Sequence, residues 1–151
     1  MLARIRKAMD ENEQGFTLIE LLVVMIIIGI LAAIAIPVFL NQRKNAVDAS
    51  YKSDLRTVAN EMESYYTDNE AYPATAPATA AVGTGPTIGG QVVRVSKNTQ
   101  ISVTYNAAAP ATTAFCLTAL NTSGKGSHDW VYVSSQGGLQ ANTVTACPAT
   151  F

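Results

Sequence analysis

The stretch FTLIELLVVMIIIGILAAIAIPVFL, residues 16–40, decides the fold of this chain. Glu20 is the only charged residue in these 25 positions, and a helix of that length can cross a bilayer. A carboxylate inside hydrocarbon costs a few kcal/mol and is usually kept only where another group pairs with it. We therefore expect Glu20 to have a specific partner.

Composition places the rest of the chain in one small domain, because the whole sequence has 151 residues and a formal charge of −1. This balance gives no reason to expect nucleic acid or an acidic substrate as a partner. Beyond Ala71, the sequence is rich in Ala, Thr, Gly, Ser and Val. The charged residues there are only Arg94, Lys97, Lys125 and Asp129, and the single histidine is His128. That part predicts a β-rich, neutral surface module.

Three interpretations compete for residues 16–40. A secretory signal peptide would use Ala33-Ile34-Ala35 as its cleavage site, but the apolar run is longer than an ordinary signal core. A plain membrane anchor explains the length of the run and leaves the positions of Gly15, Phe16 and Glu20 unexplained. The third interpretation comes from a resemblance.

The segment GFTLIELLVVMIIIGILAAIAIP, beginning at Gly15, resembles the prepilin signal of type IV pilins and type II secretion pseudopilins. The similarity continues to about Tyr72, and FLNQRKNA at residues 39–46 resembles pilins from actinobacteria. The resemblance implies a leader peptide at residues 1–15, cleavage by prepilin peptidase after Gly15 on the cytoplasmic side, and N-methylation of the new amine of Phe16.

Cleavage there would also supply a partner for Glu20. A cut after Gly15 gives Phe16 a positive α-amine about one helical turn from Glu20, and opposite charges compensate each other in a low dielectric. In the resembled family, the amine pairs with the glutamate of a neighbouring subunit and sets the register of the filament. We expect the same pairing here, with the neighbour's amine.

After residue 40, the apolar positions keep a helical period: Leu40, Val47, Tyr51, Leu55, Val58, Met62 and Tyr65 or Tyr66. We predict one helix from about Thr17 to Asp68, with a membrane or filament-core part at 16–40 and an amphipathic part at 41–72. Asp48 and Lys52, four residues apart, are expected to pair on its exposed face. Tyr72-Pro73 is expected to end the helix.

Two residues of the apolar part have particular expected roles. Pro37 predicts a kink or a locally melted stretch near residues 33–37, because proline lacks the amide hydrogen that a helix needs. Gly29 is expected to allow close approach of another helix. Both positions match the pilin pattern, and both are ordinary in transmembrane helices as well.

The fold class expected is α+β, with the long helix packed against an antiparallel sheet. Residues 73–90, PATAPATAAVGTGPTIGG, predict an exposed surface loop. Residues 91–151 contain four strand-like runs, at 91–96, 100–106, 114–120 and 129–134, which predict a sheet of three to five strands. The alternating apolar residues should face the helix: Ile101, Val103 and Tyr105 in one run, Trp130 and Tyr132 in another.

Cys116 and Cys147 are the only cysteines, and neither has a ligand cluster around it. With an N-terminal export signal, this favours one disulfide over a zinc site, the alternative being two unpaired core residues. The resemblance to type IV pilins implies a bridge that bounds a C-terminal loop and ties the tail to the sheet.

The sequence indicates no enzyme, cofactor or metal site. Ser127, His128 and Asp129 are neighbours in sequence, and residues of a catalytic triad usually come from separate elements. A calcium site needs several carboxylates, and the only acid after Glu70 is Asp129. DNA binding has weak support, from a net charge of +2 after Pro73 and from Tyr105, Trp130 and Tyr132 as stacking candidates.

The resemblance implies a structural subunit of a type IV pilus, held in the cytoplasmic membrane as a precursor and polymerised with like subunits into an extracellular helical filament. Its implied partners are prepilin peptidase and assembly machinery with separate ATPases. A type II secretion pseudopilin or competence pseudopilus subunit is the first alternative. The second is an exported monomeric binding domain with a signal or anchor.

Overall fold

The computed structural model describes residues 15–74, 76–77, 79–106, 114–122 and 124–151. One long helix, α2 (Leu18–Asn69), begins and ends within one residue of the predicted bounds. The chain divides after Leu40 into two compact units, because most contacts between residues lie within one unit or the other. We call residues 15–40 the N-terminal segment and residues 41–151 the head.

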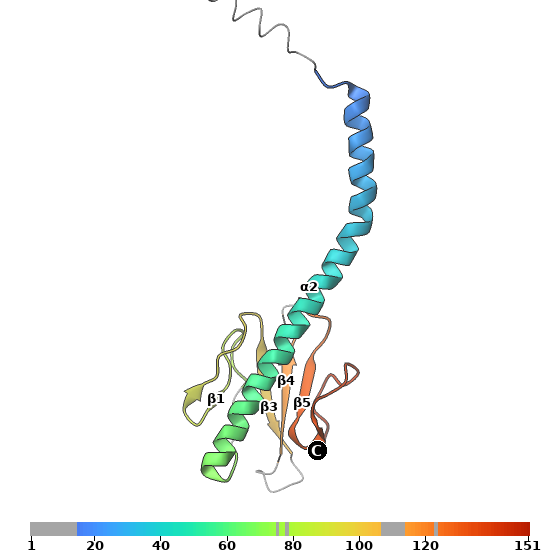
Figure 1. Cartoon of the computed structure of the whole chain (residues 1–151). Helices are drawn as coiled ribbons and strands as arrows, with labels where there is room; N and C mark the ends of the chain where they lie inside the picture. Colours follow the sequence, from blue (N-terminus) through green and yellow to red (C-terminus); the bar gives the residue numbers. More distant parts are fainter. Residues whose placement is uncertain (1–14, 75, 78, 107–113, 123) are drawn as a thin grey trace, which may run out of the picture. The chain divides into compact units, whose positions relative to one another are not determined.

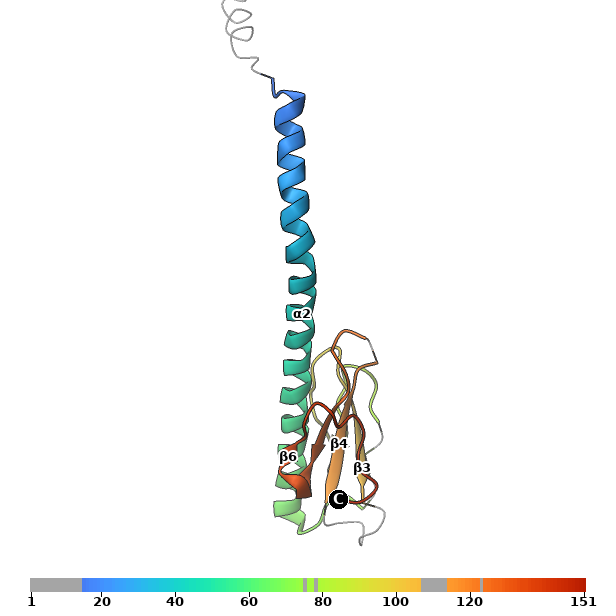
Figure 2. The same cartoon turned by 90° about the vertical axis from the view of Figure 1, so that its right-hand side faces the viewer.

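In the head, a four-stranded antiparallel sheet lies against the helix, with strand order β3-β4-β5-β6. Its strands are β3 (Gln100–Tyr105), β4 (Phe115–Leu120), β5 (Trp130–Val133) and β6 (Gly138–Leu139), with a short 3₁₀ helix η1 (Ser134–Gln136) before β6. Figures 1 and 2 show helix residues 41–69 along one face of this sheet. The α+β fold and the expected number of strands are confirmed.

The main core lies between the helix and that face of the sheet. The helix buries residues spaced three or four apart, which form one stripe: Tyr51, Leu55, Val58, Ala59 and Met62. Alternate strand residues meet them, because side chains of a strand point to opposite faces: Ile101, Val103, Phe115, Leu117, Ala119 and Trp130. The predicted alternation in β3 and β5 is therefore confirmed.

The opposite face of the sheet is also covered. Cys116, Val131 and Val133 form a second buried cluster, against which Val144 and Phe151 of the C-terminal tail pack. Strand β4 is thus buried on both faces, which explains why its sequence FCLTAL does not alternate.

Residues 87–92 form a separate hairpin of β1 (Thr87–Ile88) and β2 (Gln91–Val92). Gly89 and Gly90 join the strands with φ of 56° and 86°, the positive values that a type I′ turn requires. The strand expected over 91–96 stops at Val92, because the Val93 amide turns back to the Pro86 carbonyl at 3.0 Å. The segment predicted as an exposed loop therefore contains a strand and buries both Pro86 and Ile88.

Candidate functional site

The helix of the N-terminal segment begins with a reciprocal hydrogen-bonded cap. The Thr17 amide donates to Glu20 Oε2 at 2.8 Å, and the Glu20 amide donates to Thr17 Oγ1 at 3.3 Å. The Thr17 hydroxyl also donates to Glu20 Oε2, at 2.7 Å. This is a capping box, which satisfies amide donors that the first turn of a helix leaves free.

Glu20 therefore has a partner inside its own chain, which the sequence reasoning missed. The signal was visible as Thr-x-x-Glu immediately before an apolar run. Only Oε2 takes part in these bonds. Among the described residues, Oε1 of Glu20 receives no hydrogen bond, so one oxygen stays available to a donor from outside.

Gly15 and Phe16 precede the helix in irregular, exposed backbone. No atom lies within 4 Å of the position that a Cβ on Gly15 would occupy, outside its chain neighbours. The side chain of Phe16 is 84% exposed. The peptide bond between these two residues is thus open to another molecule, as cleavage by a peptidase would require.

Beyond this cap, the helix presents apolar side chains on every side. Large hydrophobic residues from Leu18 to Leu40 are about half exposed or more, and the most apolar stretch has no buried residue. By length and composition, this is the one described helix that could cross a membrane. So large an apolar surface must be covered by lipid or by other helices.

Gly29 and Pro37 both lie inside this helix. A Cβ on Gly29 would meet nothing within 4 Å, so close packing there needs a helix from another molecule. Residues 33–37 are helical throughout in the single chain, and the kink or local melting expected near Pro37 stays a prediction. One proline costs the helix a hydrogen bond and leaves the other bonds of the turn to hold it.

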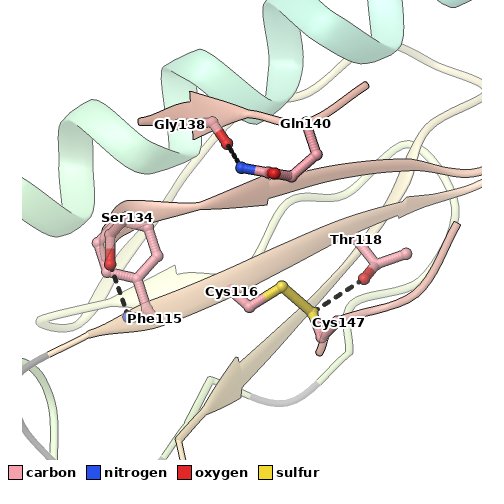
Figure 3. Close-up of a disulfide and its surroundings, with 7 residues drawn as sticks. All are labelled: Phe115, Cys116, Thr118, Ser134, Gly138, Gln140 and Cys147. Carbon is pink, nitrogen blue, oxygen red and sulfur yellow. Dashed lines mark hydrogen bonds between the residues drawn. A yellow bond between two sulfur atoms is a disulfide. The ribbon is translucent and has the colours of Figure 1, made fainter. Parts of the chain in front are cut away.

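In the head, Cys116 of β4 is bonded to Cys147 of the tail, with S–S 2.07 Å and Cα–Cα 5.9 Å. Figure 3 shows the bridge on the sheet face away from the helix, beside Thr118. The hydroxyl of Thr118 lies 3.3 Å from Cys147 Sγ. The expected disulfide is confirmed, and it closes the tail over the second hydrophobic cluster.

Ser127 lies close to the helix, where it contacts Asp48, and His128 contacts Ser127. The Ser127 amide and hydroxyl both donate to the Asp48 carboxylate, the amide at 2.9 Å, and Ser127 Oγ lies 2.6 Å from His128 Nδ1. Because the serine proton goes to the aspartate, histidine is not placed to remove it as a triad would require. The group anchors the β4–β5 loop to the helix.

Asp48 is 5% exposed, so the expected ion pair with Lys52 on an open helix face is wrong. Burial by itself raises the pKa of Asp48, but the two hydrogen bonds from Ser127, together with the Trp130 side chain and the charge of His128, lower the pKa below its ordinary value. Lys52 Nζ instead lies 3.8 Å above the centre of the Trp130 ring, in a cation–π contact.

The aromatic residues considered for DNA stacking belong to the core. Trp130 is 8% exposed, and Tyr132 stacks on Phe115 with ring centres 6.1 Å apart. The buried hydroxyl of Tyr105 has no partner among the described residues, and burial raises its pKa to about 12. No group of three His, Cys, Asp or Glu side chains suited to a metal occurs in the described part of the chain.

Comparison with known proteins agrees with the geometry at the N-terminus. Residues 11–36 match the family described as the prokaryotic N-terminal methylation motif. The type IV wide pilus major component PilA4 of Thermus thermophilus is 34% identical over 113 residues, which cover 75% of this chain and 77% of that protein.

Type II secretion system core protein G is similar over a shorter length. The protein from Pseudomonas aeruginosa is 38% identical over 76 residues, covering 50% of this chain and 54% of the relative. The one from Escherichia coli is 32% identical over 78 residues, covering 52% and 54%. The chain thus spans about half the length of these secretion proteins.

Proposed function

This chain belongs to the family of type IV pilins and type II secretion pseudopilins, and we propose that it is the structural subunit of a type IV pilus. The precursor is held in the cytoplasmic membrane by residues 16–40. After processing, the subunits polymerise into an extracellular filament whose interior is built from these apolar helices.

The observation that carries this proposal is the exposed apolar helix, which begins with the Thr17–Glu20 cap directly after an accessible Gly15–Phe16 bond. A helix that is apolar all round is stable in lipid or among other such helices. Membrane and filament core are the two environments that a pilin occupies in turn. The same surface serves both, which accounts for the absence of a polar side from Leu21 to Leu40.

Processing is proposed at the bond between Gly15 and Phe16, with methylation of the new Phe16 amine. Before cleavage, that nitrogen is part of a peptide bond and carries no charge. Afterwards it is an ammonium group, and methylation leaves it able to carry the charge. Removal of the leader therefore creates the positive partner that the carboxylate of Glu20 lacks.

We propose that the partner of Glu20 is the Phe16 amine of a neighbouring subunit. Thr17 of the same chain already occupies Oε2, and Oε1 is open among the described residues. A carboxylate can accept several hydrogen bonds, so an incoming ammonium can bind without breaking the cap. Gly29 is proposed as a point of close helix contact, and Pro37 as a point where the helix yields during assembly.

A pilus is favoured over a secretion pseudopilus by the length of the similarity. PilA4 matches over three quarters of this chain, whereas the core protein G relatives match over half. A pseudopilin remains the second candidate, because those relatives have similar percentage identity over the part that they share. No catalytic role is proposed for either assignment.

Processing is tested on filaments sheared from cells, by intact mass and N-terminal sequencing. A subunit that starts at Phe16 and carries one methyl group supports the proposal. A subunit that starts at Ile36 would instead identify a secretory signal peptide and refute it. Loss of filaments without loss of protein secretion, after deletion of the gene, separates the pilus from the secretion pseudopilus.

The role of Glu20 is tested by two variants that separate charge from capping. Glu20→Gln keeps an oxygen acceptor at the third helical position, as capping boxes accept Gln, but removes the charge. Thr17→Val removes the two hydrogen bonds of the Thr17 hydroxyl from the cap and keeps the charge. We expect both to be cleaved, the first to assemble poorly and the second to form filaments. Normal filaments from Glu20→Gln would contradict the proposed pairing.

A further inference from the structure

The charges of the head are separated by sign. Between Thr57 and Val93, the sequence has four acidic side chains and no basic one: Glu61, Glu63, Asp68 and Glu70. The remainder of residues 41–151 has seven basic and three acidic side chains. One region therefore carries a formal charge of −4, the rest +4, and the head as a whole is neutral.

Two of these acidic side chains, Glu61 and Asp68, line a groove between the end of the helix and the β1–β2 hairpin. We call it the acidic groove; its volume is about 510 Å³. Its lining includes Glu61 and Asp68 on the helix and Gly89 in the turn of the hairpin. The ring of Tyr65 packs where a Cβ on Gly89 would lie, at 2.8 Å, so the hairpin sits tightly against the helix.

The basic side chains of the sheet region lie on neighbouring loops. We call Arg94, Lys97 and Lys125 the basic loop surface. Its first loop is anchored to the helix, because the Ser96 amide donates to the buried Asp54 at 3.0 Å. Lys125 Nζ donates to Asn98 at 3.2 Å, which brings the second loop beside the first.

These charges have no ionic partners within the described residues. No hydrogen bond or ion pair is found there for the side chains of Glu61, Asp68, Arg94 or Lys97, and Lys125 bonds only a neutral amide. An anchor at Asp54 places the basic loop surface near that level of the helix. Glu61 and Asp68 lie 7 and 14 residues further, or roughly 10 and 21 Å along the axis.

We propose that the acidic groove of one subunit binds the basic loop surface of a second copy of this chain. A filament grows through heterologous contacts, in which two different patches of the same subunit meet. Two patches of opposite sign, displaced along the helix axis, are what such a contact needs. This inference rests on the proposed function, since it describes the head contact within the filament.

Complementary charges at this contact would also set the register of the heads. Like charges placed opposite each other repel, so subunits in the wrong register are rejected. Exposed charges further apart than about 10 Å are largely screened at 0.1 M salt. Filament formation should therefore weaken as the salt concentration is raised.

The test uses two charge-reversed full-length variants, expressed singly and together. Glu61→Lys with Asp68→Lys makes both surfaces positive, and Lys97→Glu with Lys125→Glu makes the basic loop surface mainly negative. Each variant expressed alone should reduce the yield of sheared filaments at least about ten-fold relative to the unaltered protein. Expressed together, they should restore filaments that contain both, because alternating subunits again present opposite charges at each contact.

A matched control adds charge elsewhere on the head. Gln136→Lys with Asn142→Lys changes the net charge by two at exposed positions outside both surfaces, and Glu61→Gln with Asp68→Asn makes the same change in the groove. The control should assemble like the unaltered protein, and the groove variant should not. Folding is checked through the amount of mature, disulfide-bonded subunit in the membrane.

Failure of the inference and failure of the proposed function give different results. If the unaltered chain forms no filaments, the proposed function is wrong. If it forms filaments and the folded variants also assemble alone, or fail to rescue each other, the head contact is wrong while the function stands. A cysteine pair placed at Glu61 and Lys97 should also give a reducible ladder of oligomers, and its absence in filaments would overturn the contact.

Discussion

The strongest stability prediction concerns the bridge between Cys116 and Cys147. The two cysteines are 31 residues apart. In the chain-entropy treatment, closing a loop of that length stabilises the fold by about 3.7 kcal/mol at 25 °C. Within a head of some 110 residues, this corresponds to about 15 °C in the midpoint of thermal unfolding.

The structure suggests which part of the head is affected first by reduction. The bridge holds the tail over Val131 and Val133 on the far face of the sheet. Without it, Val144 and Phe151 are held to the sheet by hydrophobic packing and by the hydrogen bond from Asn106 Nδ2 to the Phe151 carbonyl. The main core between the helix and the sheet should remain folded at room temperature.

The assay uses the full-length protein in mild detergent, with urea or heat as the denaturant. Trp130 is the only tryptophan and lies in the head core, so its fluorescence reports on unfolding of the head. We expect reduction to lower the unfolding midpoint of the unaltered chain. The Cys116→Ala, Cys147→Ala variant should show the lower midpoint already and should not respond to reductant. An unchanged midpoint on reduction would refute the reasoning.

Three other predictions concern the head. Asp54→Ala removes the acceptor for the Ser96 amide and for the hydroxyls of Ser96 and Thr99. Because buried donors are then left unsatisfied, the variant should destabilise the head by about 3 kcal/mol in urea unfolding. Asp54→Asn, which keeps one oxygen, should destabilise the head less. The pKa of Asp48 lies below its unfolded value, so its contribution to the stability of the head is present above about pH 4 and is lost as the pH falls through the folded pKa. The difference in urea midpoint between the unaltered chain and Asp48→Asn should therefore shrink in acid. A difference that stays constant with pH would contradict this assignment. Gly85→Ala would place a Cβ 1.9 Å from the Val93 carbonyl oxygen, so the hairpin must shift, at a cost of about 2 kcal/mol; Gly90→Ala meets no such atom and should cost only its backbone strain.

The helix and the sheet could be predicted from the sequence because their signals are local and periodic. The stripe from Tyr51 to Met62 repeats at helical spacing, and Ile101 with Val103 alternates as a strand does. The disulfide was accessible for a similar reason, since two cysteines leave one possible pair. In each case the pattern is contained in the residues that form the element.

What the sequence did not reveal depends on contacts between distant residues. Asp48 has the spacing of a surface ion pair with Lys52, yet the β4–β5 loop, 79 residues away at Ser127, buries it. The strand expected at 91–96 stops at Val92, where the Val93 amide bonds the Pro86 carbonyl, and Ser96 is bonded instead to Asp54, 42 residues away. The cap at Thr17 is the exception: its Thr-x-x-Glu signal is local, and it was missed because Glu20 was considered only as a charge.

The buried aspartates also explain why the head is polarised. A buried carboxylate is tolerated when donors saturate it, and here those donors are neutral groups of Ser96, Thr99 and Ser127. Basic side chains are therefore not consumed in neutralising Asp48 and Asp54. Arg94 and Lys97, on the loop that Asp54 holds, stay exposed on the surface of the same region. The hydrogen bonds that fix the loops thus leave the positive surface free for contact between subunits.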